Sequence, residues 1–435
     1  MSFKEALMSG LAPDGGLYMP SNIPVIGIDE IESYRSQDYS KTAASVLGHF
    51  LRDEIDAQIL SSICKEACNF DIPLEKISGQ EYIMRLDQGP TASFKDFAAR
   101  IMARLMHHYL SAEKGRMTIL TATSGDTGSA VASAFHGFSD IDVIILFPFK
   151  EVSEMQRKQM TTLKGNIHVV AVDGKFDDCQ ELVKKAFLDR SLAYLSLSSA
   201  NSINIGRLLP QSVYYFHAWS RVSENVDDKA AFSVPCGNFG NLMGGLLAKK
   251  MGLPASRFII STNSNDEVPE FLRTGIYRTI SPSINCISSA MNVGHPSNFA
   301  RIVTLYGGVM NEKGSILKYP DIEQMRKDLF GTSISDEVTR KTITDFYRRY
   351  GSVIEPHGAV AWKGIDEYRK AWPHEDAIYI SLETAHPSKF DAEIRRLTGL
   401  SPRLPKNLEG IDEISEEYIK IENDYNKLKK IIIKH

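Results

Sequence analysis

The sequence predicts an α/β protein built on mostly parallel sheets, because apolar and amphipathic segments alternate from residue 117 onward. The apolar segments Met117–Thr123, Ile141–Phe149 and Ile167–Val172 are typical of strands. Between them, Glu151–Leu163 and Asp178–Asp189 have the period of amphipathic helices. Apolar strands joined by crossover helices indicate parallel sheets that are covered on both faces.

The alternation continues along the rest of the chain. We expect strands at Ala193–Leu197, Phe232–Cys236, Phe258–Thr262 and Ala377–Leu382, and helices at Ile205–Val222, Leu242–Met251, Asp336–Tyr350 and His357–Trp372. A chain of 435 residues exceeds one hydrophobic core. We predict a mostly helical region at 1–80, a smaller α/β domain at 81–215, and a larger α/β domain with C-terminal helices at 216–435.

The two ends of the chain are expected to be helical. Lys41–Phe50 and Asp53–Ala67 predict helices in the first region. The tail, residues 409–435, is rich in Lys, Glu and Ile, which favours a solvated terminal helix without a role in chemistry. Its packing residues are expected to be Ile414, Ile419 and Ile421.

The bulk composition argues against several classes of function. A net charge of −4 and a pI near 6.3 give no support for nucleic acid or an anionic membrane as a partner. No segment approaches the roughly 18 consecutive apolar residues of a membrane span, and the N-terminus lacks a signal-peptide pattern, so we expect a cytoplasmic location. The scattered cysteines predict free thiols and no metal site; they are Cys64, Cys68, Cys179, Cys236 and Cys286.

Lys95 is the most informative residue of the chain. It follows the turn Gly89–Phe94 (GPTASF), and apolar residues then recur at helical spacing. Lys95 is therefore expected in the first turn of a half-buried helix, where the positive end of the helix dipole favours the neutral amine. A neutral, partly desolvated amine is what a Schiff base with an aldehyde cofactor requires. The alternative is a surface lysine whose stem covers apolar side chains.

Two glycine-containing turns each join a strand to a helix N-terminus. They are Ser124–Gly128 (SGDTG) and Gly237–Asn241 (GNFGN). Free backbone N–H groups and the helix dipole favour an anion at such turns, and glycine allows a close approach to phosphate oxygens. Neither turn matches a Walker A loop or the dinucleotide-binding fingerprint. Taken alone, each turn is also explained by packing.

Two polar positions follow strands in the same way. Thr384 follows Ala377–Leu382, and a hydroxyl there can bond a pyridine nitrogen without forcing its protonation; the alternative is a helix cap. Arg207 ends the segment Ser199–Arg207 (SANSINIGR). Its guanidinium offers a bidentate fork to phosphate oxygens, and the alternative is a capping cluster with a surface arginine.

The motifs GPTASFKDFAAR, TATSGDTGSA, SANSINIGRLLPQ, PCGNFGNLMGG and SLETAHPSKF occur in that order. Together with LAPDGGLYMP at residues 11–20, they make nearly the whole sequence resemble the threonine synthase family. The resemblance implies a fold-type-II pyridoxal-phosphate enzyme with two open sheets, flanking helices and a helical N-terminal region. It also implies a carbon–oxygen lyase that converts O-phospho-L-homoserine and water into L-threonine and phosphate, the last step of threonine biosynthesis.

The resemblance further implies which residues form the site. Lys95 would be the catalytic residue, which forms the Schiff base with pyridoxal phosphate and then acts as a general base. The cofactor-binding residues would be Lys95, Gly237, Asn238, Phe239, Gly240, Asn241 and Thr384. The substrate-binding residues would be Thr123, Ser124, Asp126 and Thr127 for the α-carboxylate, and Asn201, Ser202, Asn204 and Arg207 for the phosphate.

Three residues keep open roles at this point. Asp126 stands where many relatives of the wider fold type have Asn, and an ionised carboxylate cannot donate a hydrogen bond to the ring oxygen of the cofactor. His295 is expected to be a structural loop residue. His386 is close to Thr384 in the chain but is not assigned to catalysis.

Several functional alternatives also stay open. A related phospho-lyase would release 2-oxobutyrate, ammonia and phosphate from the same substrate, and no motif separates it from the synthase. A non-catalytic pyridoxal-phosphate protein is disfavoured by the presence of Lys95, Thr384 and Arg207 together. A nicotinamide oxidoreductase is disfavoured because the fingerprint spacing is missing. The chain is expected to act on a small molecule, as a monomer or homodimer.

Overall fold

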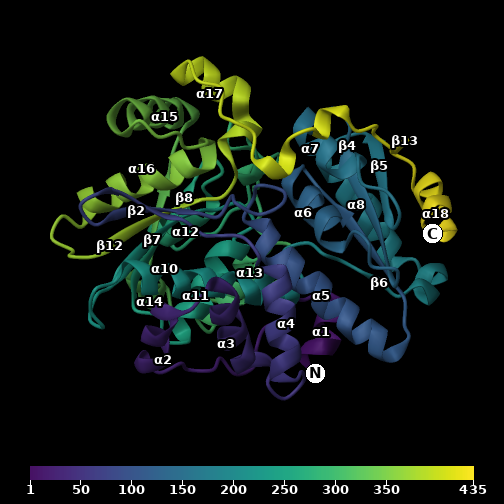
Figure 1. Ribbon diagram of the computed structural model, residues 1–435, viewed down its shortest axis with the longest axis horizontal. Coiled ribbons are helices and arrows are strands. Elements are labelled where there is room, and N and C mark those ends of the chain that lie inside the picture. The colour runs from purple at the N-terminus through teal and green to yellow at the C-terminus, as the bar shows by residue number, and fades with distance from the viewer.

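The computed structural model describes all residues, 1–435, and contains two sheets side by side (Figure 1). The smaller sheet has the strand order β13-β5-β4-β3-β6, and all its neighbours are parallel. Its strands are β3 (Met117–Ala122), β4 (Ile141–Pro148), β5 (Ile167–Asp173), β6 (Leu197–Ser198) and β13 (Ile419–Glu422). Its flanking helices are α6 (Asp126–Phe135), α7 (Glu154–Thr161), α8 (Phe176–Leu188) and α18 (Tyr425–Lys434).

The larger sheet has the order β1-β2-β12-β7-β8-β11, in which only the β1–β2 pair is antiparallel. Its strands are β1 (Leu74–Ser78), β2 (Glu81–Arg85), β7 (Ala230–Pro235), β8 (Ala255–Thr262), β11 (Leu329–Ser333) and β12 (Ile378–Glu383). In Figure 1, α15 (Asp336–Tyr350) and α16 (Pro356–Ala371) cover one face, and α10 (Val213–Val222) and α11 (Gly240–Lys250) cover the other. The prediction of two open, mostly parallel sheets is confirmed.

The N-terminal helices lie along the lower edge of the molecule in Figure 1. They are α1 (Phe3–Ser9), α2 (Ile28–Ser33), α3 (Tyr39–Leu51) and α4 (Ala57–Ala67). The remaining elements are α5 (Lys95–Glu113), α9 (Ile205–Leu208), α12 (Glu267–Thr274), α13 (Phe299–Leu305), β9 (Val309–Met310), β10 (Ile316–Lys318), α14 (Ile322–Asp328) and α17 (Asp391–Thr398). No helix combines the length and the apolar character that crossing a bilayer requires.

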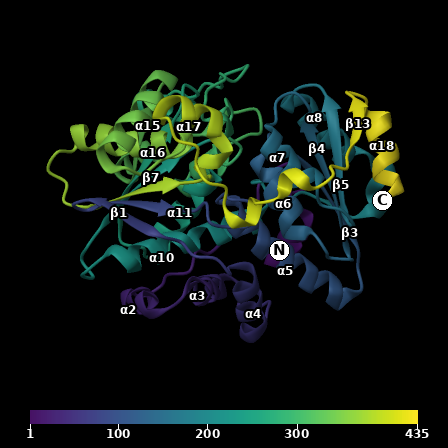
Figure 2. The same ribbon diagram turned by 45° about the horizontal axis from the view of Figure 1, so that its top comes forward.

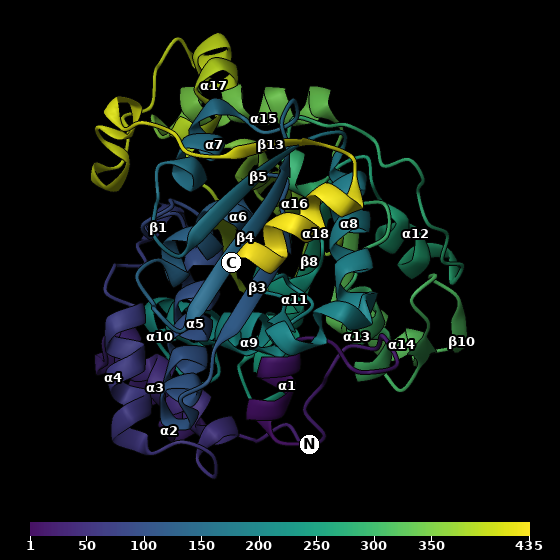
Figure 3. The same ribbon diagram turned by 90° about the vertical axis from the view of Figure 1, so that its right-hand side faces the viewer.

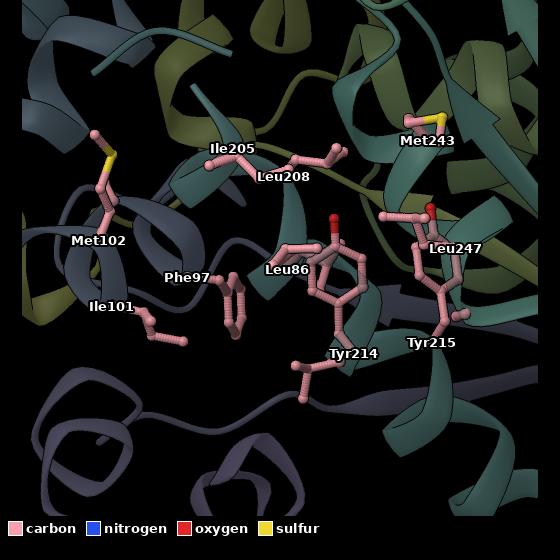
Figure 4. Close-up of a cluster of buried hydrophobic side chains, with 14 of the residues drawn as sticks. Leu86, Phe97, Ile101, Met102, Ile205, Leu208, Tyr214, Tyr215, Met243 and Leu247 are labelled. Carbon is pink, nitrogen blue, oxygen red and sulfur yellow. The ribbon is translucent and has the colours of Figure 1, made fainter. Parts of the chain in front are cut away.

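One hydrophobic core joins the two sheets. Figure 4 shows Phe97 of α5 between Ile101 and Tyr214, with Leu86 beside them. Side chains at alternate strand positions face opposite sides: Ile119 belongs to this core, whereas its neighbour Leu120 packs with the α8 and α18 side chains. Burial on both strand faces explains the continuous apolar runs of the sequence.

The tail differs from its prediction as a single helix. Its segment 419–422 is strand β13, which pairs in parallel with β5, and only 425–434 form a helix. Ile414 and Ile419 are exposed, and Ile421 is buried. Figures 2 and 3 show the C-terminal segment running from α17 to β13 and α18 on the smaller sheet. Pairing with the free edge of β5 outweighs the local helix preference of this segment.

Both sheets draw on distant parts of the chain. The larger sheet includes β1 and β2 from residues 74–85, and the smaller sheet includes β13 from residues 419–422. The N-terminal part of the chain therefore adds β1 and β2 to an edge of the larger sheet, and the C-terminal part adds β13 to an edge of the smaller sheet. The division at residues 80 and 215 stays a prediction.

Candidate active site

Lys95 is the first residue of α5, as predicted. The turn before it is closed by Asp96, whose carboxylate accepts from the Thr91 backbone N–H at 2.9 Å and from its hydroxyl at 2.7 Å. Gly89 is required in this turn, because a Cβ there would lie 2.4 Å from an Asp96 oxygen. Ala92 takes a left-handed φ of 54°. The motif therefore works as one locked turn that presents Lys95.

The Lys95 amine lies in a charged, buried environment. Burial lowers the pKa of its ammonium; Asp126 opposes this effect, and Lys389 and Arg207 add to it. An Asp126 carboxylate oxygen lies 3.8 Å from Nζ. The lowered pKa favours the neutral amine that the sequence motif predicts.

The Thr384 segment lies against the Lys95 turn. The Phe94 N–H donates to the Thr384 carbonyl at 2.9 Å, and the His386 N–H donates to the Ala92 carbonyl at 3.0 Å. Thr384 directly follows β12 and is buried. Two motifs almost 300 residues apart in the sequence thus lie side by side.

The Gly237–Asn241 turn follows β7 and leads into α11. No backbone carbonyl accepts from the N–H groups of residues 237–242. Gly237 lies so close to the chain that a Cβ would be 2.5 Å from the Ala290 carbonyl oxygen, and Phe239 has a left-handed φ of 61°. The turn presents a row of backbone donors without any charged side chain.

Asn241 completes this turn with a side-chain donor. Its Oδ1 accepts from the hydroxyls of Tyr214 and Tyr215, each at 2.6 Å. With Oδ1 held in this way, the buried Nδ2 has no protein partner. An orphaned buried donor beside a row of backbone N–H groups fits a bound anion.

The Ser124–Gly128 turn follows β3 and leads into α6. The Thr123 hydroxyl accepts from the N–H groups of Gly125 and Gly128 at 2.9 and 2.8 Å, so it organises the turn from within. Gly125 has a φ of 137°, which favours glycine. Ser124 is exposed and Thr127 is half-buried, which leaves both hydroxyls near the surface of the turn.

Asp126 is the charged residue of this turn. Its Oδ1 accepts from Lys389 Nζ at 2.9 Å and from Gln156 Nε2 at 3.0 Å. Burial raises the pKa of the Asp126 carboxyl, but Lys389 and Lys95 outweigh burial and hold it well below its usual range. Asp126 is therefore an ionised acceptor, in agreement with the exclusion of a donor role.

The Asn201–Arg207 segment follows β6 and includes the first three residues of α9. Asn204 is fully buried, donates to the carbonyls of Leu7 and Ser199, and caps α9 at the Gly206 N–H, so its side chain is occupied within the protein. Arg207 is also buried. Asn201 and Ser202 are half-buried.

Arg207 is a buried cation without an acidic hydrogen-bond partner. Its Nη1 donates to the Ala200 carbonyl at 2.7 Å, and its buried Nε has no partner. Burial lowers the pKa of Arg207 to about 10. A buried guanidinium with a free donor is a suitable site for an anion with several oxygens.

His295 and His386, whose roles the sequence left open, are both hydrogen-bonded within the protein. His295 bonds the Tyr277 hydroxyl through Nδ1 and the Glu312 carbonyl through Nε2, each at 3.0 Å. His386 accepts from the Ser388 N–H at 3.1 Å, and burial, with Arg85 and Lys389, lowers its pKa to about 4. Both side chains are thus engaged by neighbouring groups of the protein.

Sequence reasoning missed two buried cations. Lys389 lies within the SLETAHPSKF motif, yet its position six residues beyond the end of the buried strand β12 was the only signal. Arg301, in α13, donates to the carbonyls of Tyr18 and Ile203 and to Asn298 Oδ1. It also donates to the Ser202 carbonyl at 3.2 Å, so it holds the Asn201–Arg207 segment from behind.

Comparison with known proteins agrees with this geometry. The family model "Pyridoxal-phosphate dependent enzyme" matches residues 70–382, "Threonine synthase N terminus" matches 1–68, and "Threonine synthase, C-terminal" matches 358–432. The chain is 40% identical to threonine synthase of Buchnera aphidicola subsp. Schizaphis graminum and 38% identical to that of Escherichia coli. Each alignment covers 100% of this chain and 97% of the relative. The chain belongs to the threonine synthase family.

Solved structures of the family have the same fold. The pyridoxal-phosphate-bound threonine synthase of Brucella melitensis matches with a TM-score of 0.91 and 34% identity, over 99% of this chain and 96% of that one. The Escherichia coli threonine synthase matches with a TM-score of 0.88 and 37% identity, over 100% and 97%. The fold-type-II architecture and dependence on pyridoxal phosphate, which the resemblance implied, are confirmed for the family of this chain.

Proposed function

We propose that this chain converts O-phospho-L-homoserine and water into L-threonine and phosphate. The proposal rests on one largely buried amine, Lys95, together with two separate candidate anion sites. One site is the neutral Gly237–Asn241 turn, and the other is the segment that ends in Arg207. A cofactor phosphate and a substrate phosphate need two such sites.

The residues fit pyridoxal phosphate. Its phosphate would lie on the free N–H groups of Gly237, Asn238, Phe239 and Gly240 and on Asn241, which accounts for the orphaned Nδ2. Thr384 would bond the pyridine nitrogen, and Lys95 would hold the aldehyde carbon. When bound, pyridoxal phosphate supplies an electron sink that stabilises negative charge on substrate carbons near the amine.

Lys95 would move the protons of the reaction. With the substrate in the site, the Lys95 amine would act as a general base at the substrate Cα. A second proton would leave Cβ as phosphate leaves Cγ, and protons would then return to Cγ and Cα. The hydroxyl of water would add at Cβ, and its remaining proton would leave with the phosphate. A flexible four-carbon amine reaches all these positions, and burial favours its neutral form by lowering its pKa.

The substrate would be held by charge and by the turn geometry. Arg207, with Asn201 and Ser202, would bind the leaving phosphate, and Ser124 and Thr127 would bind the α-carboxylate at the start of α6. Thr123 and Asn204 would contribute indirectly, because their side chains shape the two loops from within.

Product analysis tests this proposal. The purified protein is incubated with pyridoxal phosphate and O-phospho-L-homoserine, and the products are identified by mass spectrometry and a phosphate assay. We expect threonine and phosphate in equal amounts, and no turnover by Lys95→Ala. Release of 2-oxobutyrate and ammonia would identify the lyase instead, and the absence of consumption would identify a non-catalytic cofactor protein.

The cellular location and the oligomeric state are proposed from the sequence. The acidic net charge, with no feature suited to nucleic acid, fits an enzyme that meets its substrate in the cytoplasm. We propose a monomer or homodimer, which size-exclusion chromatography with light scattering distinguishes directly.

A further inference from the structure

A second lysine, Lys389, lies buried in the site and has no part in the reaction described above. Its side chain is 1% exposed, and its Nζ lies 2.9 Å from Asp126 Oδ1. Lys389 belongs to the short 3₁₀ helix η5 (Pro387–Phe390) that follows β12, whereas Asp126 begins α6 after β3. The ion pair therefore links the larger sheet to the smaller one at the strand ends that surround Lys95.

Asp126 is shared between two ammonium groups. Oδ1 is taken by Lys389 and Gln156, and Oδ2 lies 3.8 Å from Lys95 Nζ. The two hydrogen bonds to Oδ1 fix the rotation of the carboxylate and leave Oδ2 directed at Lys95. Asp126 and Lys389 are both almost fully buried, and a buried carboxylate is stable in this form only with well-placed partners.

We infer that Lys389 is a positioning residue for the proposed reaction, which holds Asp126 as a carboxylate aimed at the Lys95 amine and thereby sets the charge state of that amine. The inference rests on the proposed role of Lys95. Lys389 acts through Asp126 and does not itself take or give the proton.

The charges that face Lys95 come from four elements. Asp126 on α6 favours its ammonium form, as does Glu355 just before α16, whereas Lys389 on η5 and Arg207 on α9 disfavour it. In the absence of Lys389, Asp126 would have Lys95 as its only cationic partner. The proton would then be held more tightly on Lys95, and a smaller fraction of the amine would be available as a base at neutral pH.

Lys389→Met in the holoenzyme tests this inference, with Lys389→Arg as the charge-preserving control. The pH dependence of kcat/KM for O-phospho-L-homoserine and the pH titration of the visible absorbance of the bound cofactor are both measured. For Lys389→Met we expect the acid limb and the absorbance midpoint to move upward by about one pH unit. At neutral pH, kcat/KM should fall roughly tenfold, mostly in kcat. Lys389→Arg should have the same acid limb of the kcat/KM profile and the same absorbance midpoint as the parent protein.

Other outcomes would overturn the inference. A rise in KM with unshifted pH profiles would identify Lys389 as a direct substrate ligand. pH profiles that are the same for Lys389→Met and Lys389→Arg would show that Lys389 has only a structural role. If Lys389→Met does not fold, Asp126→Asn with Lys389→Met removes both charges. That double variant should titrate close to the parent, because two opposing influences on Lys95 are lost together. The absorbance titration needs no substrate, so it stands even if the proposed reaction fails.

Discussion

The two proposed anion sites are built in opposite ways. The Gly237–Asn241 turn has no charged side chain and offers backbone N–H groups and one amide that two tyrosines orient. The Asn201–Arg207 segment has the buried Arg207 within it and the buried Arg301 behind it. An uncharged site would suit the cofactor phosphate, which stays bound. A buried cation would suit the substrate phosphate, which binds and is released in each turnover. The comparison predicts that substitutions in one loop leave the affinity of the other unchanged.

Arg207→Ala should have the largest effect. Loss of a charge-assisted bidentate contact costs about 2–4 kcal/mol, so kcat/KM for O-phospho-L-homoserine should fall roughly 30- to 1000-fold. Inhibition by free phosphate should weaken in parallel, while the dissociation constant of pyridoxal phosphate should barely change. If the variant loses the cofactor and keeps its inhibition by phosphate, the two sites are assigned the wrong way round. Arg207→Lys keeps the charge without the bidentate fork, so its kcat/KM should lie between those of the parent protein and Arg207→Ala.

Arg301→Lys should have an intermediate effect. An ammonium has the charge of the guanidinium but cannot reach the four acceptors on three separate segments, so carbonyls such as that of Ile203 are left unpaired. We expect the free energy of unfolding to fall by about 2 kcal/mol and KM for the substrate to rise about fivefold. Urea denaturation and steady-state kinetics measure both. A weaker cofactor affinity with an unchanged KM would contradict the assignment of Arg301 to the substrate loop.

Tyr215→Phe should have the smallest effect and should act on the other loop. Asn241 loses one of the two hydroxyls that orient its amide, which is worth about 1 kcal/mol, or roughly a fivefold weaker affinity for pyridoxal phosphate. The phosphate inhibition constant should not change. Tyr34→Phe removes another buried hydroxyl, bonded to Glu30 outside the site, and serves as the matched control.

The sequence predicted the positions in the site that depend on local chemistry. Lys95 at a helix start and Thr384 after a strand follow from patterns within a few residues, and parallel strands bring such ends to one edge. The two-sheet fold was predictable for the same reason, since each buried strand is a continuous apolar run.

The pairings between distant residues were not predictable. The Lys389–Asp126 ion pair joins residues 263 positions apart, and either residue alone is typical of a solvated surface. Asn204 and Thr123 carry the polar groups of ligand contacts, yet their side chains turn inward to shape the loops. Strand β13 has four residues with a pattern that also suits a helix, so only the free edge of β5 decides its structure.

Borohydride reduction of the cofactor-loaded protein, followed by peptide mapping, tests the central claim that the site is organised around Lys95. The account predicts a single pyridoxyl-modified peptide, which contains Lys95, at a stoichiometry near one per chain. Modification of the other buried lysine of the site, Lys389, would show that the roles of the two amines are reversed and would contradict the account.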